Sequence, residues 1–405
     1  MGKSTSQLIL VALLLAASAS SLYAQGASQS GPTKPSAEVY GFAMLDIGHN
    51  FKTINPSWFD TMRVTKLPSS PGQFGEDNST FAGVRQSRLG VRTTTPTDLG
   101  DLKTTFEFEL FGVGVDEGQT TFRLRHAYGE IGAIGAGQYW SPFMDPDVFP
   151  NSLEYWGPTG MVFFRNVQLR WMPIRGDTSL TLALERPGAS GDPGVLANRV
   201  ELQNVRGRFP LPDLTGAYKF GSHWGYARAA FALRRINWDD TLADQFDLSG
   251  HATGWGINLS SNIKVAKDVV RLQYVFGSGI QNYMNDSPVD VGLTPNFGNP
   301  VTPVVGDTIG IQGLVAFLDH VWTDHYSSTV GYSWQDNDNT IGQTPSSFKT
   351  GHYALGNLLY TPVANVMFGG EFQWGRRENF SDGFSYDGYK LQFSFKYNFS
   401  QKFGG

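Results

Sequence analysis

The stretch Tyr-Lys-Leu-Gln-Phe-Ser-Phe-Lys-Tyr-Asn-Phe, residues 389–399, decides the fold class of this chain. Every odd position carries an apolar or aromatic side chain, and every even position carries a polar one. A period of two is typical of a β-strand with two different faces, whereas a helix repeats every 3.6 residues. The segment also has the length of a tilted membrane-crossing strand, about 9–11 residues. It therefore predicts one strand of a transmembrane barrel, with one face toward lipid and the other toward a polar interior.

The same alternation recurs along the chain. We count about sixteen such segments, and an even number is expected of a bacterial outer-membrane barrel. Their centres lie near residues 43, 88, 107, 125, 136, 169, 181, 216, 231, 257, 272, 312, 330, 356, 369 and 393. We therefore predict an all-β fold, a transmembrane antiparallel β-barrel of about 16 strands.

Connection lengths give an independent indication of the same architecture. Barrels have short turns on the periplasmic side and longer loops outside. Short turns are expected at 96–101, 132–133, 173–177, 221–223, 266–268, 322–325 and 362–365. Longer connections are expected between them, at 51–82, 141–163, 187–211, 277–305 and 336–349. A soluble sandwich has no reason to keep this regular alternation.

Composition excludes several other classes of protein. The 405 residues carry a formal net charge of -5, and only 17% of them are charged, against about 25% in an ordinary globular protein. The chain has 48 Gly, 14% aromatic residues and no Cys. A disordered chain is poor in aromatics, and a nucleic-acid binder carries a basic excess. Without Cys, neither a disulfide framework nor a Cys-based zinc site is possible.

The N-terminus indicates export. Lys3 precedes an apolar run at 8–17, small residues follow at 18–21, and Ala24 before Gln25 offers a cleavage point. This order is typical of a secretory signal peptide, and the run is shorter than the about 20 residues of a membrane-spanning helix. The alternative is a buried N-terminal helix. We predict a cleavable signal peptide at 1–24, a short periplasmic linker at 25–37 and an outer-membrane barrel domain at 38–405.

Arginine dominates the polar face of the predicted strands. The candidate pore-lining residues are Arg88, Arg92, Arg123, Arg125, Arg170 and Arg228. Guanidinium groups stay charged and bind carboxylates with two parallel hydrogen bonds, so a wall of them concentrates anions in a narrow pore. The alternative is that these side chains only solvate the lumen, paired with Glu107, Glu109 or aspartates opposite.

The segment 141–163 is too apolar for a solvated loop. It contains three Pro within residues 141–150, and its aromatic side chains need burial. We therefore predict that it folds inward as a constriction loop, with Asp145, Asp147 and Glu154 as its candidate acidic residues. Asp145 and Asp147 would then face the arginine wall. The alternative is an outward loop packed at a subunit contact.

Several motifs resemble the DcaP-like family of trimeric outer-membrane porins. They are residues 84–90 (VRQSRLG), 106–114 (FEFELFGVG), 122–130 (FRLRHAYGE), 143–151 (FMDPDVFPN) and 155–160 (YWGPTG). The resemblance covers about residues 38–175 and is only topological beyond them. It implies a sixteen-stranded barrel, a homotrimer in outer-membrane lipid, and diffusion of anionic solutes, especially dicarboxylates.

Two features depart from that family. Better-known members carry a helical, coiled-coil segment before the barrel, and residues 25–37 are too few for one. The final aromatic residue usually ends such barrels, but six residues follow Phe399 here. Either Phe399 still ends the last strand, or Phe403 provides the terminal aromatic.

Nothing in the sequence indicates catalysis. Seven scattered His without Cys or close His/Asp spacing do not predict a metal site, and no Gly-x-Ser-x-Gly elbow is present. We expect no catalytic residue, no metal and no cofactor, and a passive channel for small anionic solutes rather than an enzyme. The alternatives are a non-specific general diffusion porin and a structural or adhesive surface barrel.

Overall fold

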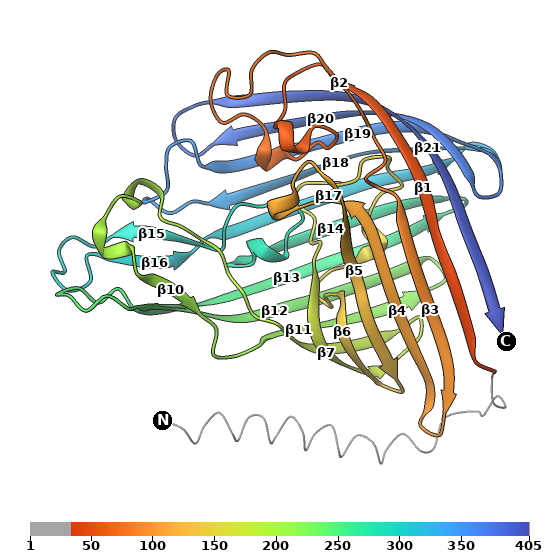
Figure 1. Cartoon of the computed structure of the whole chain (residues 1–405), viewed down its shortest axis with the longest axis horizontal. Helices are drawn as coiled ribbons and strands as arrows, with labels where there is room; N and C mark the ends of the chain where they lie inside the picture. The colour runs from red at the N-terminus through yellow and green to blue at the C-terminus, as the bar shows by residue number, and fades with distance from the viewer. Residues whose placement is uncertain (1–33, 405) are drawn as a thin grey trace.

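The alternating segments form the wall of one closed antiparallel sheet in the computed structural model, which describes residues 34–404 (Figure 1). Each of the sixteen predicted segment centres lies within a different wall strand, so the predicted fold class is confirmed. The wall strands are β1 (Ser36–Asn50), β3 (Arg88–Thr97), β4 (Gly100–Phe111), β5 (Thr120–Ile131), β6 (Ile134–Trp140), β7 (Arg165–Ile174), β8 (Ser179–Glu185), β11 (Asp213–Ser222), β12 (Gly225–Asp240), β13 (Gly250–Val265), β14 (Asp268–Ser278), β17 (Gly310–Val321), β18 (Tyr326–Asp338), β19 (Phe348–Val363), β20 (Val366–Asn379) and β21 (Ser385–Gly404).

Two positions of the wall are occupied by interrupted strands. β2 (Ser79–Gly83) and β3 both pair with β1, β2 with its second half and β3 with its first half. In the same way, β10 (Val205–Arg208) and β11 both pair with β12. These two short strands prolong neighbouring wall positions and add none of their own.

The barrel closes between its first and last strands. β1 and β21 pair without a break from Ser36↔Gly404 to Asn50↔Lys390. Strand pairing therefore continues past Phe399 to Gly404, and Phe403 faces Ala37. Of the two alternatives for the end of the chain, the one that stops the strand at Phe399 is therefore wrong. Pairing of β1 with β21 means that neither the first nor the last strand of the wall is an open edge, which a membrane would not tolerate.

Turns and loops alternate as predicted. Successive wall strands are joined by short turns at one end and by longer connections at the other (Figure 1). Within two of the longer connections, β9 (Gly191–Asp192), β15 (Val291–Pro295) and β16 (Val304–Thr308) form a separate three-stranded sheet. The extracellular end of the barrel is the one with the longer connections.

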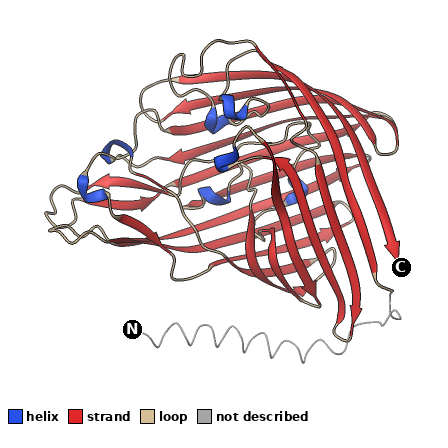
Figure 2. Cartoon of the chain, in the orientation of Figure 1, coloured by secondary structure: helices blue, strands red, loops and turns tan. Residues whose placement is uncertain are grey.

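Within residues 34–404, helix occurs only as single short turns in loops (Figure 2). In the described part of the chain, no helix is long and apolar enough to cross a membrane. The helical turns are η1 (Pro56–Trp58), η2 (Val64–Lys66), η3 (Gly114–Asp116), η4 (Pro146–Val148), η5 (Gly194–Leu196), η6 (Val200–Leu202) and η7 (Gln281–Tyr283).

The two faces of the wall differ as the sequence indicates. On β21, Phe393 is 50% exposed on the outer face, whereas Gln392 and Ser394 are buried on the inner face. Gln392 donates to the backbone oxygen of Leu153, in one of three loop segments, 51–78, 141–164 and 279–290, that fold into the barrel. One buried side chain from each, namely Met62, Phe143 and Tyr283, joins a single apolar cluster with residues of the wall.

The predicted signal peptide at 1–24 lies outside the described residues, as does most of the predicted linker. Both boundaries stay predictions. β1 begins at Ser36, two residues before the predicted start of the barrel at residue 38.

Candidate functional site

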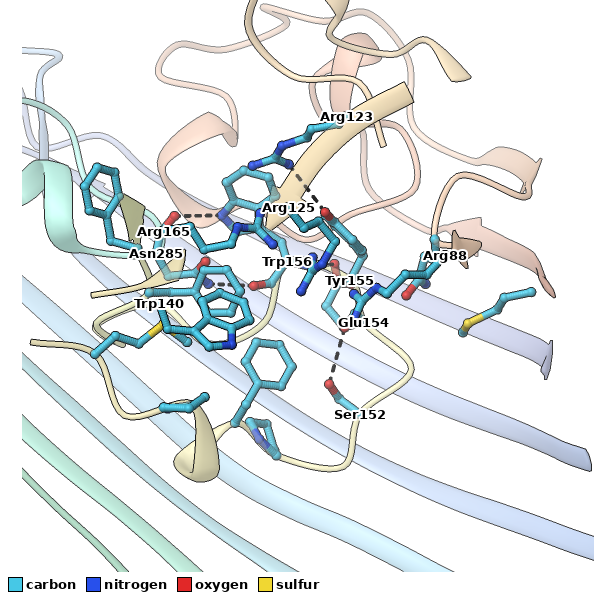
Figure 3. Close-up of a pocket in the computed structure, with 18 of the residues that line it drawn as sticks. Arg88, Arg123, Arg125, Trp140, Ser152, Glu154, Tyr155, Trp156, Arg165 and Asn285 are labelled. Atoms are coloured by element: carbon cyan, nitrogen blue, oxygen red, sulfur yellow. Dashed lines mark hydrogen bonds between the residues drawn. The ribbon is translucent and has the colours of Figure 1, made fainter. Parts of the chain in front are cut away.

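A cavity of about 580 Å³ lies inside the barrel, between the wall strands β3–β7 and the inward segment 141–164. Figure 3 shows its arginine side and its loop side. On the wall it is lined by Arg88, Arg123, Arg125, Arg165 and Lys396. On the loop it is lined by Phe149, Ser152, Glu154, Tyr155 and Trp156, among others.

The arginines surround one buried carboxylate. The Glu109 side chain on β4 is fully buried and lies within 4 Å of four guanidinium groups. The N···O distances are 2.6 Å to Arg125, 3.4 Å to Arg123, 3.6 Å to Arg88 and 3.8 Å to Arg165. Such a carboxylate offsets the mutual repulsion of the guanidinium groups and fixes where they point.

A second carboxylate, Glu107, lies two residues before Glu109 on the same face of β4. Arg125 Nε donates to Glu107 Oε1 at 2.6 Å, and the Tyr40 hydroxyl donates to Glu107 Oε2 at 2.8 Å. The β4–β5 register shifts at Arg125, where Glu107 faces His126 and the next residue of β4 faces Leu124. This bulge leaves two consecutive residues, Arg125 and His126, buried side by side in the interior.

The cavity wall keeps an excess of positive charge. Five cationic side chains, the four arginines and Lys396, line the cavity. Two carboxylates, Glu107 and Glu109, pair with the arginines. Five positive and two negative charges leave +3 at this wall. Arg88 and Arg123 have the most accessible side chains of the four arginines, 25% and 27% exposed, so they are the best placed to meet a solute.

Tyr155 connects the loop to this charged wall. Its hydroxyl donates to Glu109, and its ring stacks on Phe111 with centroids 3.7 Å apart. Burial, together with the charge of Glu109, raises the pKa of Tyr155 to about 12. The phenol therefore stays protonated at neutral pH and keeps donating. Beside it, the Trp156 indole donates to the backbone oxygen of Asn285 (Figure 3).

Segment 141–164 crosses the lumen, as predicted for the constriction loop, but its aspartates do not face the arginine wall. Asp145 is buried and accepts hydrogen bonds from Tyr226 of β12 and Ser260 of β13. Asp147 pairs with Lys219 of β11 at 3.2 Å. The prediction that these two aspartates oppose the arginines is therefore wrong. They attach the first part of the loop to the far wall.

Glu154 does line the cavity, but its charge is already paired. Its carboxylate forms an ion pair with Lys390 of β21, and both side chains are fully buried. Glu371 of β20 accepts from the backbone N–H groups of Leu153 and Glu154, at 2.8 and 3.0 Å. These contacts fix the tip of the loop against the last strands of the barrel.

The other predicted arginines lie outside this cavity. The Arg92 guanidinium stacks on the Tyr40 ring at 4.1 Å. Arg170 donates to Gln168 and packs against Tyr128. Arg228 donates to the backbone oxygen of Met144 at 2.7 Å, so it supports the loop from the far wall. Of the six predicted arginines, only Arg88, Arg123 and Arg125 therefore line the cavity.

Sequence reasoning missed two of the five cationic residues at the cavity. Arg165 is the first residue of β7, and the preceding Phe163 and Phe164 hide the alternation there. Lys396 belongs to the polar face of the alternating segment 389–399, but pairing with β1 is what places it near Phe42, with Nζ 4.1 Å from the ring centre. The alternation identifies the face of Lys396, and only the closed barrel brings it to the arginines.

Within residues 34–404, no group of three His, Asp or Glu side chains is arranged to hold a metal ion. The cavity offers fixed positive charge, hydrogen-bond donors and aromatic surface, and these are means of selecting a solute.

A closed barrel with an apolar outer face, an inward loop and a charged cavity beside that loop defines a porin, a channel of the bacterial outer membrane. The chain belongs to the DcaP outer membrane protein family, whose model matches residues 38–399. The resemblance seen in the sequence is thus confirmed, and so are the bacterial outer-membrane location and the expectation that the protein is not an enzyme.

Solved structures share the fold. The outer membrane channel DcaP of Acinetobacter baumannii has a TM-score of 0.73 and 21% identity, covering 90% of this chain and 98% of that chain. An anion-selective porin from Comamonas acidovorans has a TM-score of 0.56 and 11% identity over 90% and 100% of the two chains. A trimer form of OmpT from Vibrio cholerae has a TM-score of 0.53 and 11% identity over the same shares. No curated protein matches the sequence.

Proposed function

We propose that this porin conducts small anionic solutes, above all dicarboxylates, along the arginine wall. The excess of +3 charge at the 580 Å³ cavity supports this most directly. The charges at the narrowest section decide selectivity, because the field is focused there and salt screens the charges of distant loops beyond about 8–10 Å. A net charge of -5 for the whole chain is therefore compatible with anion selection.

The preference for dicarboxylates follows from the spacing of donors. Arg88 of β3 and Arg123 of β5 are both partly exposed and lie on two sides of β4. Their guanidinium groups converge on the Glu109 carboxylate between them, with N···O distances of 3.6 and 3.4 Å. A solute with two carboxylates can engage one guanidinium fork with each, whereas a monovalent anion uses only one.

Arg88→Gln combined with Arg123→Gln tests the proposal. This change removes two of the five cations but keeps Arg125, which holds Glu107 and Glu109. We expect the anion/cation permeability ratio in a planar bilayer to fall toward unity, and block of chloride current by succinate to weaken. Arg175→Gln is the matched control, because Arg175 pairs with Glu130 away from the cavity. An unchanged reversal potential in the double variant would mean that the arginines only solvate the lumen.

We also propose that the porin is a homotrimer. The proposal rests on the family resemblance, and the trimer form of OmpT has the same fold. Light scattering in mild detergent should give three times the mass of one chain, and single-channel records should close in three equal steps. A single-chain mass together with one-step closure would contradict it.

A further inference from the structure

The outer face of the wall carries a group of arginines at the extracellular ends of β8, β10 and β12. Arg234 of β12 points inward, where it pairs with Asp213 and Asp290. Because strand side chains alternate, Arg235 points outward. In the ladder between β10 and β12, Arg206 faces Asp239 and Arg208 faces Asn237. These side chains lie on the same outward face as Arg235, since residues paired across a ladder share a face.

Most of this positive charge is unpaired. Arg208 forms an ion pair with Asp239, with both side chains well exposed. Arg206 and Arg235 form no ion pair with any acidic residue of the described chain, and neither does Arg186, the exposed residue that follows β8. Four arginines and one aspartate leave an outward charge of +3, which we call the rim patch (Arg186, Arg206, Arg208, Arg235 and Asp239).

Acidic residues of the next loop do not neutralise the rim patch by pairing. In the loop that follows β12, Asp244 accepts the backbone N–H of Phe246, and Asp247 accepts that of Ser249. Asp240 accepts two backbone N–H groups of the same loop. Their hydrogen bonds serve to shape the loop.

An apolar belt begins directly below the rim patch. Leu233 lies two residues before Arg235 and is exposed, and it faces the exposed Trp255 across the ladder to β13. Leu214 of β11 is also exposed on this outer face. Tryptophan on the outer face of a barrel marks the level where lipid chains meet headgroups. The rim patch therefore lies at the level of the outer-leaflet headgroups.

The opposite side of the barrel has the reverse charge. On β18, the buried Gln335 and Asn337 point inward, so Asp336 and Asp338 point outward. On β20 and β21, Arg376 is paired with both Glu378 and Asp387. The excess of positive charge at the rim patch is thus not shared by this opposite rim, where acidic side chains pair with the cations.

We propose that the rim patch binds the phosphorylated headgroup of a glycolipid of the outer leaflet, of the diphosphoryl disaccharide type, while its acyl chains lie on the apolar belt below. Guanidinium groups bind phosphate oxygens with two parallel hydrogen bonds. The patch extends from the end of β8 to β12, two strand positions or about 10 Å. A headgroup with two phosphates can contact arginines at both ends of it.

Native mass spectrometry in detergent with added diphosphoryl lipid A tests the proposal. We expect the wild-type porin to bind this lipid at least tenfold more tightly than its dephosphorylated form. Arg186→Gln with Arg206→Gln and Arg235→Gln should weaken binding at least tenfold, because none of these three guanidinium groups forms an ion pair within the described residues and each is available to phosphate. The matched control, Lys349→Gln with Arg376→Gln on the opposite rim, should stay within twofold of the wild type.

Three results would overturn the assignment. The triple variant could bind the lipid within twofold of the wild type, or the control could lose as much as the triple variant. Equal binding of the diphosphorylated disaccharide without acyl chains would show a phosphate site that does not recognise lipid. A heat-modification assay on the same samples establishes that all variants are folded barrels.

Discussion

Replacing Lys390 by Met should release the tip of the inward loop without unfolding the barrel. Lys390 Nζ pairs with Glu154 and also donates to the backbone oxygen of Asp60 at 2.8 Å. Both charged side chains are fully buried. Removing one partner of a buried ion pair leaves an uncompensated charge, which costs about 3–5 kcal/mol.

The hydrogen bonds that remain in Lys390→Met determine whether the loop tip stays attached to the wall. Glu371 still accepts two backbone N–H groups of the loop, from Leu153 and Glu154, and hydrogen bonds to a charged group contribute about 1.5–3 kcal/mol each. The loss is thus similar to the roughly 3–6 kcal/mol that these two bonds still provide. We expect the loop tip to detach intermittently in Lys390→Met, with more open-channel noise and brief steps of higher conductance.

Single-channel recording in a planar bilayer measures this, and a second variant isolates the cause. Lys390→Met with Glu154→Gln removes both charges, so no unpaired charge remains, and most of the wild-type stability of the current should return. Lys402→Met is the control, because Lys402 is exposed at the end of β21. If the double variant is as noisy as Lys390→Met, the buried charge is not what disturbs the loop, and the reasoning fails.

Further predictions concern the loop, an outer connection and the closing strand. Gly160→Ala should destabilise the folded barrel by about 1–3 kcal/mol and so lower the temperature midpoint of heat modification. The reason is that Gly160 has φ +70° and an added Cβ would meet the backbone oxygen of Trp334. An unchanged midpoint would contradict this. The hydrogen bond from Lys52 lowers the pKa of Asp77 in the folded protein below its ordinary value of about 3.9. The pair therefore stabilises loop 51–78 fully above about pH 3.9. This stabilisation is lost as the pH falls through the lowered pKa of Asp77 in the folded state. Protease protection of that loop should therefore stay constant from pH 8 to about 4 and fall only below it, whereas Asp77→Asn should lose protection at neutral pH. Deleting residues 400–405 should slow barrel assembly in pulse-chase heat-modification assays, because Phe403 and its neighbours pair with β1; assembly at the wild-type rate would count against that role.

The wall of this protein could be predicted because alternation is a local property. Each strand shows its two faces in its own sequence, as residues 389–399 do. The lengths of the connections then distinguish the periplasmic end of the barrel from the extracellular end. The interruptions were not predictable in this way. β2 and β3 are separated at residues 84–87 because Arg85 turns inward to pair with Asp60 of the first loop, a partner 25 residues away.

The site could be predicted only in part. Arg88 on β3 and Arg123 and Arg125 on β5 lie on the polar face on either side of β4, and that was enough to bring them together. Asp145 and Asp147 were assigned to the wrong wall, because the direction in which a loop crosses the lumen depends on distant partners such as Tyr226 and Lys219. Inward folding of segments 51–78 and 279–290 had no comparable signal, since neither has the concentration of Pro and aromatic residues found at 141–163.

The pairing that closes the barrel also makes the chain suitable for circular permutation. Ser36 and Gly404 face each other across the ladder between β1 and β21, at the end of the barrel with the short turns. A linker of a few residues between these two positions would convert the seam into an ordinary hairpin. New chain ends could then be opened at the turn after Ala266 or the turn before Val366, which would bring an epitope or a fluorophore to a chosen point on the periplasmic mouth while leaving the cavity and its loop unchanged.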